Sequence, residues 1–109
     1  MGAGLRQSGI IFGVNLMEIQ AKHIIVHGRV QGVGFRYFVR EAGMKRGLKG
    51  DTRNCPDGTV EIIVEGGAVE IGDFLKDVER GPALSRVKHM DVADISARGS
   101  YDSFFVEGC

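Results

Sequence analysis

The sequence predicts an α+β sandwich whose elements run strand, helix, strand, strand, helix, strand, the split βαβ arrangement. Three observations lead to this prediction. Residues 35–46 and 69–80 carry apolar side chains at the spacing of amphipathic helices. The segments around them carry β-branched runs or the alternation of strands. At 109 residues, 43% of them hydrophobic, the chain is long enough for one core and too short for two.

The first element is a β-branched run at residues 23–27, which predicts a buried central strand closed by Gly28. His23 and His27 are four residues apart and therefore share one face of that strand. No third metal ligand is near them in the sequence, so we interpret both histidines as structural.

A glycine-rich loop follows, in which Gly28, Gly32 and Gly34 precede Arg36. Glycine permits positive φ and close approach of a ligand, so several N–H groups can point at one anion. The next helix adds unpaired N–H groups, and the Arg36 fork can grip two phosphate oxygens. Position 37 is tyrosine and Gly-Lys-Ser/Thr is absent, which excludes a dinucleotide fingerprint and a P-loop. By the residues alone, an oxyanion site and a tight turn with a surface arginine remain equally open.

The two helices are predicted from their apolar stripes. The first, 35–46, is stopped by Gly47 and places on one stripe Phe35, Phe38, Val39 and Ala42. The second, 69–80, is stopped by Gly81 and Pro82 and has a stripe of Ile71, Phe74, Leu75 and Val78.

The remaining strands are predicted from alternation and turn chemistry. A weak strand at 48–54 and a strong one at 59–65 flank Cys55-Pro56-Asp57-Gly58, whose turn-forming order predicts a hairpin. Residues 87–95 form a strand whose imperfect alternation indicates a bulge. Residues 104–106 can add a last short strand.

The charge and hydropathy of the chain limit the kinds of partner that it is expected to bind. Residues 17–50 hold seven Lys/Arg against two Asp/Glu, and residues 51–109 hold six against twelve, so the half with the glycine loop is basic although the net charge is zero. This asymmetry suits a small anionic substrate. A neutral domain is not typical of nucleic-acid binding, and no stretch reaches the roughly 18 apolar residues of a membrane span. We expect neither kind of partner.

The cysteines indicate the cellular compartment that we expect for the protein, and the N-terminal residues indicate where its domain is expected to begin. Cys55 and Cys109 form neither a disulfide framework nor a metal-ligand spacing, so a cytoplasmic protein with reduced thiols is expected. Cys55 adjoins Asn54, but no base that could activate its thiol is evident. Residues 1–16 are expected to be an extension, non-native or flexible, of a domain at 17–109.

Two stretches resemble signatures of one family. Val30-Gln31-Gly32-Val33-Gly34-Phe35-Arg36 resembles the phosphate-binding signature of the acylphosphatase family. Residues 50–66 resemble its second signature, with matches at Gly50, Arg53, Asn54, Gly58, Val60 and Gly66. The resemblance covers about residues 19–107. It implies a ferredoxin-like α/β sandwich (βαββαβ), a mostly antiparallel sheet with two helices on one face.

The resemblance also implies an activity: hydrolysis of the carboxyl-phosphate bond of a small acyl phosphate to a carboxylate and inorganic phosphate, without metal or cofactor. We expect a monomer. The resemblance implies that Arg36 and Asn54 are catalytic, with Asn54 positioning water. Phosphate would be held by Gln31, Gly32, Val33, Gly34, Phe35 and Arg36. In one departure, Asp51 stands where the family usually has an aromatic residue. Being three residues from Asn54, Asp51 should face the other side of the strand and affect packing more than the water site.

Two alternatives remain open. The same signature resembles the N-terminal domain of hydrogenase-maturation carbamoyltransferases, which handle carbamoyl phosphate, but those chains are much longer and carry zinc-finger cysteines that are missing here. A ferredoxin-like binding module, for example for RNA, is the second. The aromatic pair that an RNA-binding sheet would expose is not evident in residues 59–65.

Overall fold

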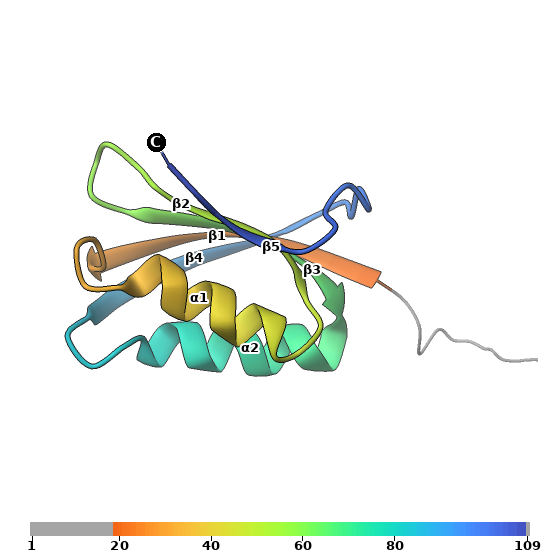
Figure 1. Ribbon diagram of the computed structural model, residues 1–109, viewed down its shortest axis with the longest axis horizontal. Helices are drawn as coiled ribbons and strands as arrows, with labels where there is room; N and C mark the ends of the chain where they lie inside the picture. Colours follow the sequence, from red (N-terminus) through yellow and green to blue (C-terminus); the bar gives the residue numbers. More distant parts are fainter. Residues whose placement is uncertain (1–18, 109) are drawn as a thin grey trace, which may run out of the picture.

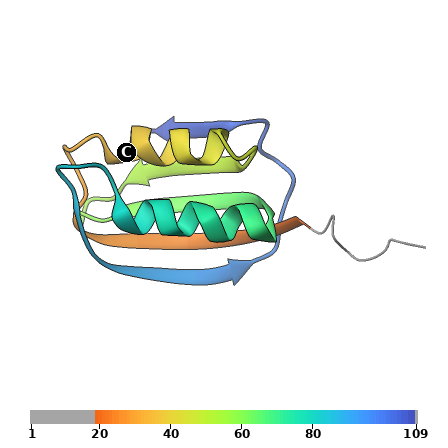
Figure 2. The ribbon, with the colours of Figure 1, turned by 90° about the horizontal axis from the view of Figure 1, so that it is seen from below.

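The computed structural model describes residues 19–108, which form a five-stranded sheet with two helices packed on one face (Figure 1). The elements in chain order are β1 (Ile19–Arg29), α1 (Phe35–Met44), β2 (Lys49–Asn54), β3 (Val60–Gly67), α2 (Ala68–Arg80), β4 (Arg86–Ile95) and β5 (Phe104–Glu107). The helices lie side by side across the sheet, and the opposite face carries neither of them (Figure 2).

The sheet is mixed, with the strand order β4-β1-β3-β2-β5. The pairs β1–β3, β1–β4 and β2–β3 are antiparallel, whereas β2 and β5 are parallel. The first six elements occur in the predicted order. The seventh, β5, extends the sheet beyond β2, a pairing that the sequence pattern did not indicate.

The core lies between the sheet and the helices. The predicted stripe of α2, the predicted face of β3 and three residues of the predicted α1 stripe (Phe35, Val39 and Ala42) face it, whereas the fourth, Phe38, is only half-buried and lies outside the core cluster. Its largest fully buried side chains are Phe35, Phe74, Ile24, Ile62 and Ile71, with the smaller Val26, Val30, Val39, Val60, Val64 and Val78 between them. Burial of apolar side chains is the main stabilising term, so this layer fixes where α1, and with it the glycine loop, lies on the sheet.

The two helices are also joined by charge. Asp77 of α2 is buried, and its carboxylate lies 2.6 Å from Arg46, just beyond the end of α1. Burial alone would raise the pKa of Asp77, but its hydrogen bond and ion pair with Arg46, together with the charge of Lys45 and a hydrogen bond from Arg80, outweigh burial and hold the pKa below the usual range. The paired carboxylate therefore stays ionised and helps to fix α1 against α2.

Strand β1 differs from its prediction. It lies inside the sheet as expected, but it spans eleven residues, of which only Ala21, Ile24 and Val26 are buried. Ile24 and Val26 are fully buried, while His23 and His27 are half-exposed on the helix-free face. The expected central position is therefore confirmed, whereas burial is incomplete because no helix covers the face that carries His23 and His27.

The predicted bulge in β4 is confirmed. His27 pairs with His89 and Gly28 pairs with Val87, which leaves Lys88 as the extra residue on β4. Gly28, at the bulge, has a φ of 131°, and a Cβ there would lie 2.1 Å from the Arg86 carbonyl oxygen. This glycine is therefore required for contact between β1 and β4, and its expected place in the anion-binding loop was wrong.

Replacing Gly28 with alanine is expected to lower the free energy of unfolding by about 2 kcal/mol, because the methyl group overlaps the β4 backbone. Urea unfolding measures this change. The matched control is Gly72→Ala in α2, where a Cβ meets no atom within 4 Å and alanine favours the helix. Equal stability of Gly28→Ala and wild type would contradict the close approach of the two strands.

The predicted extension, residues 1–16, lies outside the described residues, as does Cys109. The proposed domain 17–109 is described from residue 19 to residue 108. In that part of the chain, neither helix combines the length and the apolar character that crossing a bilayer requires.

Candidate active site

The loop between β1 and α1 has the backbone that its glycines predict. Gly32 and Gly34 adopt φ values of 73° and 77°, in the left-handed region, and a Cβ at either position would meet no atom within 4 Å. Glycine is therefore favoured at both positions by conformation and not by space. The two left-handed residues bend the chain sharply from the strand into the helix.

The N-terminal end of helix α1 carries unpaired backbone N–H groups and the positive end of the helix dipole. Gly34 is its N-cap, and the first backbone bond runs from the Phe38 N–H to the Gly34 carbonyl oxygen. The N–H groups of Phe35, Arg36 and Tyr37 consequently have no partner within the helix. The first turn holds no acidic side chain to offset the helix dipole. An anion at this end of α1 would meet donors that are already oriented.

Arg36, in that first turn, is half-buried and anchored by the C-terminal strand. Its Nη1 donates a hydrogen bond of 2.6 Å to the carbonyl oxygen of Glu107 in β5. Within residues 19–108, no carboxylate forms an ion pair with Arg36. One nitrogen of the guanidinium is thus fixed by the protein, and the positive charge is left for an external anion.

Asn54, the last residue of β2, lies against the same loop. A pocket of about 110 Å³ is lined by Val30, Gly32, Gly34, Phe35, Arg36, Tyr37 and Asn54. The fold thus brings Arg36 and Asn54, eighteen positions apart in the sequence, to one cavity. The Asn54 Oδ1 is buried and has no hydrogen-bond partner among the described residues. An unpaired buried acceptor of this kind usually serves a ligand, an ion or a water.

Gln31 links the two halves of the pocket. Its Nε2 donates hydrogen bonds of 2.8 Å to the carbonyl oxygens of Cys55 and Thr59, at either end of the β2–β3 turn. Its side chain therefore ties the glycine loop to the hairpin that carries Asn54, and only the Gln31 backbone is left for an anion. This bridging role, like the pocket lining by Tyr37 and the Arg36 anchor on β5, escaped the sequence analysis because it depends on long-range contacts.

The turn after Asn54 is held by its own residues. The N–H of Gly58 donates to the Cys55 carbonyl oxygen, and the Cys55 N–H donates to the Thr59 carbonyl oxygen. Asp57 Oδ1 accepts from the Thr59 hydroxyl at 2.6 Å and from its N–H at 3.0 Å, and these hydrogen bonds lower the pKa of Asp57. Cys55 is a free thiol that does not line the pocket.

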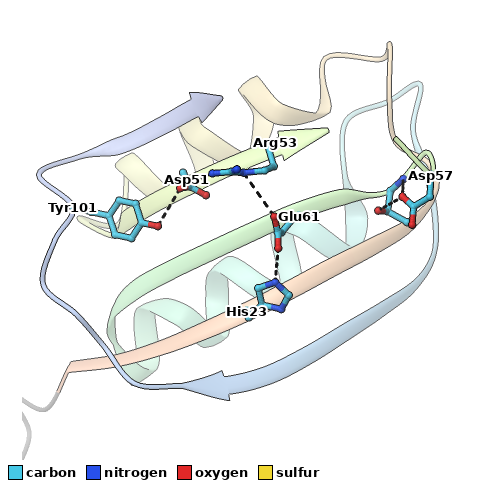
Figure 3. A network of polar contacts seen from close by, with 7 residues as sticks. His23, Asp51, Arg53, Asp57, Glu61 and Tyr101 are labelled. Carbon is cyan, nitrogen blue, oxygen red and sulfur yellow. Dashed lines mark hydrogen bonds and ion pairs between the residues drawn. The ribbon is translucent and has the colours of Figure 1, made fainter. Parts of the chain in front are cut away.

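Asp51 lies on the helix-free side of β2, within a polar network (Figure 3). It is buried, and its Oδ2 accepts a hydrogen bond of 3.0 Å from the Tyr101 hydroxyl and faces Arg53 at 3.5 Å. Burial and then this hydrogen bond raise the pKa of Tyr101, and the charge of Asp51 raises the pKa of Arg53. An acid with two polar partners thus stands where the family resemblance led us to expect an aromatic residue, outside the residues that line the pocket.

Comparisons with known proteins agree with one another. The Acylphosphatase family model matches residues 22–106. An acylphosphatase of Bacillus pumilus (strain SAFR-032) is 45% identical over 86 residues, which cover 79% of this chain and 96% of that protein. The crystal structure of acylphosphatase from Bacillus subtilis superposes with a TM-score of 0.78 at 39% identity, covering 81% of this chain and 98% of that one. A full-length HypF, in a phosphate- and nucleotide-bound form, superposes with a TM-score of 0.76 at 32% identity, covering 86% of this chain but 12% of HypF.

Proposed function

The chain belongs to the acylphosphatase family, hydrolases that act on acyl phosphates, and on this premise we propose that the pocket between the glycine loop and Asn54 is its active site. The observation that carries the proposal is that Arg36 and Asn54 line one pocket with Gly32 and Gly34.

In this site the phosphoryl group is held by the N–H groups of residues 31–36 and by the Arg36 guanidinium. The left-handed glycines, the unpaired N–H groups at the start of α1 and the lack of a carboxylate partner for Arg36 within residues 19–108 support this role. Donors fixed before the reaction stabilise the charge of the transferring phosphoryl group without reorganising. This is the form of catalysis on which phosphoryl transfer mainly depends.

Asn54 positions the attacking water, whose O–H donates to the unpaired Oδ1. The water oxygen forms a bond to phosphorus while the bond from phosphorus to the acyl oxygen breaks, and its electron pair leaves on a carboxylate. The products are a carboxylate and inorganic phosphate, H2PO4⁻, which keeps the oxygen and both protons of the water. Because Gln31 binds the hairpin to the loop, the water site and the phosphate site keep a fixed separation.

The leaving group explains why the pocket can work without an acid. A carboxylic acid has a pKa of about 4 to 5, so the carboxylate leaves without protonation. No carboxyl or imidazole group is among the side chains that line the pocket. A phosphate monoester leaves as a far more basic alkoxide, so this arrangement favours acyl phosphates.

Activity is therefore expected to be unchanged in excess EDTA and to be selective for acetyl or benzoyl phosphate over a phosphate monoester. The assay compares initial rates for both substrate classes before and after EDTA treatment. Loss of acyl phosphate hydrolysis in EDTA, with recovery on adding a divalent ion, would contradict the mechanism.

The proposal also covers the oligomeric state, the cellular location and the fold type of the protein. The exposed edge strand β4 carries Lys88, Asp91 and Asp94, and charged edges oppose strand pairing between molecules, which supports a monomer. The free thiol of Cys55 is in keeping with the cytoplasm. The order of the first six elements, with both helices on one face, supports a ferredoxin-like sandwich to which β5 is added.

A further inference from the structure

Three potential metal ligands converge on the helix-free face of the sheet, away from the residues that line the pocket. They are His27 of β1 and His89 and Asp91 of β4. The His27 Nε2 lies 2.9 Å from Asp91 Oδ2, and the His89 Nε2 lies 2.6 Å from Asp91 Oδ1. The ring centroids of the two histidines are 5.3 Å apart. Each of the two imidazoles therefore directs its Nε2 atom at the carboxylate of Asp91.

The strand register fixes this arrangement. His27 and His89 are directly opposite each other in the antiparallel pairing of β1 and β4. His89 and Asp91 are two residues apart on one strand and so share a face. Opposite residues of an antiparallel pair have Cβ atoms about 5 Å apart, which leaves room for one small ion between their side chains. The backbone thus gathers the three side chains before any ion arrives.

We propose that His27, His89 and Asp91 form a binding site for one divalent transition-metal ion, of which Zn²⁺ is the representative. Imidazole nitrogens and a carboxylate oxygen are ligands that zinc prefers, and a water can complete a tetrahedron. The ligand atoms all lie within 4.8 Å of one another. Bonds of about 2.0 to 2.2 Å to a tetrahedral ion separate ligand atoms by about 3.3 Å, so small side-chain rotations suffice.

The surroundings favour a cation at this position. Asp91 supplies a carboxylate at which both imidazoles already point. All three side chains are substantially exposed, at 40%, 62% and 60%, and an ion can reach them from solvent.

His23 provides a built-in comparison. It lies on the same face of β1 as His27, but its Nε2 is 2.7 Å from Glu61 of β3, and Glu61 also faces Arg53 at 3.7 Å (Figure 3). Its carboxylate partner is thus shared with a guanidinium, and no second histidine converges on it in the described part of the chain. His23 therefore lies on the same strand and the same face as His27 but does not belong to a group of three ligands, which makes it a matched control.

The test is isothermal titration of Zn²⁺ into metal-stripped protein at neutral pH, with reduced thiols. The wild type is expected to bind one equivalent, and His27→Gln, His89→Gln and Asp91→Asn are each expected to weaken binding by about tenfold or more. His23→Gln is expected to bind as the wild type does. Zn²⁺ should also raise the melting temperature of the wild type and of His23→Gln, because it binds the folded state, and should do so less in the other variants.

Melting without zinc and circular dichroism show whether each variant is folded. Absence of saturable binding in the wild type would overturn the proposal. So would zinc binding that survives His27→Gln and His89→Gln, since the ion would then lie on other groups such as the thiols, or an equal loss in His23→Gln. Acyl phosphate hydrolysis by the folded ligand variants reports on the active site separately, so failure of either proposal is recognisable.

Discussion

Replacing Arg36 with lysine is expected to lower kcat/KM for an acyl phosphate by about 100- to 1000-fold, nearly as much as replacing it with alanine. Lysine keeps the charge but loses the planar fork. In the structure one arm of that fork is already committed, since Nη1 donates to the Glu107 carbonyl oxygen. A lysine amine cannot hold this anchor and also span two phosphoryl oxygens.

The matched control is Arg40→Lys, one turn further along α1, where the guanidinium contacts Glu41 and the Tyr37 ring and does not line the pocket. Its kcat/KM should stay close to that of the wild type. Inorganic phosphate should raise the melting temperature of the wild type and of Arg40→Lys but of neither Arg36 variant. Suppose that Arg36→Lys kept more than about a tenth of the wild-type kcat/KM, a loss under about 1.4 kcal/mol. The glycine loop, and not the guanidinium, would then supply most of the binding of the phosphoryl group.

Replacing Asn54 with alanine is expected to lower kcat by about 100-fold while inorganic phosphate still binds with nearly unchanged affinity. The amide in our mechanism orients water and does not hold the phosphoryl group, so the loss should fall on turnover. Measuring kcat together with the inhibition constant of phosphate separates the two effects. Asn54→Asp should differ from Asn54→Ala, because a carboxylate facing the phosphoryl group would also weaken phosphate binding.

Asparagine before a Pro-Asp-Gly turn is also a common turn residue, so a purely structural role for Asn54 needs its own control. Asp57→Ala removes the hydrogen bonds that hold Thr59 in the same turn, yet Asp57 does not line the pocket. It should reduce stability with a far smaller loss of kcat than Asn54→Ala. Near-normal turnover by Asn54→Ala, or equal losses in both variants, would return Asn54 to a purely structural role.

Elements defined by local spacing could be predicted from the sequence. The apolar stripes of α1 and α2, the alternation of β3 and the irregular spacing in β4 each depend on neighbours a few residues apart. The predictions failed where a distant segment decides the environment. β1 was expected to be a buried strand, and Gly28 was expected to serve the anion loop, because neither the open face of the sheet nor the approach of β4 is visible in local spacing.

The features of the candidate active site also divide into those that local sequence predicted and those that depend on tertiary contacts. Two signatures, read locally, identified Arg36, Asn54 and the glycine loop, and their chemical roles stay predictions until the variants are measured. The pocket that they share, the bridge from Gln31 and the anchor on β5 follow from the pairing of strands.

Local spacing in the sequence was enough to predict which segments are helical or extended and which faces are apolar, and to nominate the stretch that we propose binds an anion, because these properties arise within a few residues of chain. Which segments become neighbours follows from the three-dimensional fold. His27 illustrates the difference, since its spacing from His23 indicated no third metal ligand, whereas the register of β1 against β4 brings His89 and Asp91 to it. Alternation tells which face a side chain occupies, but the partner across the sheet depends on topology and register, which the whole core selects.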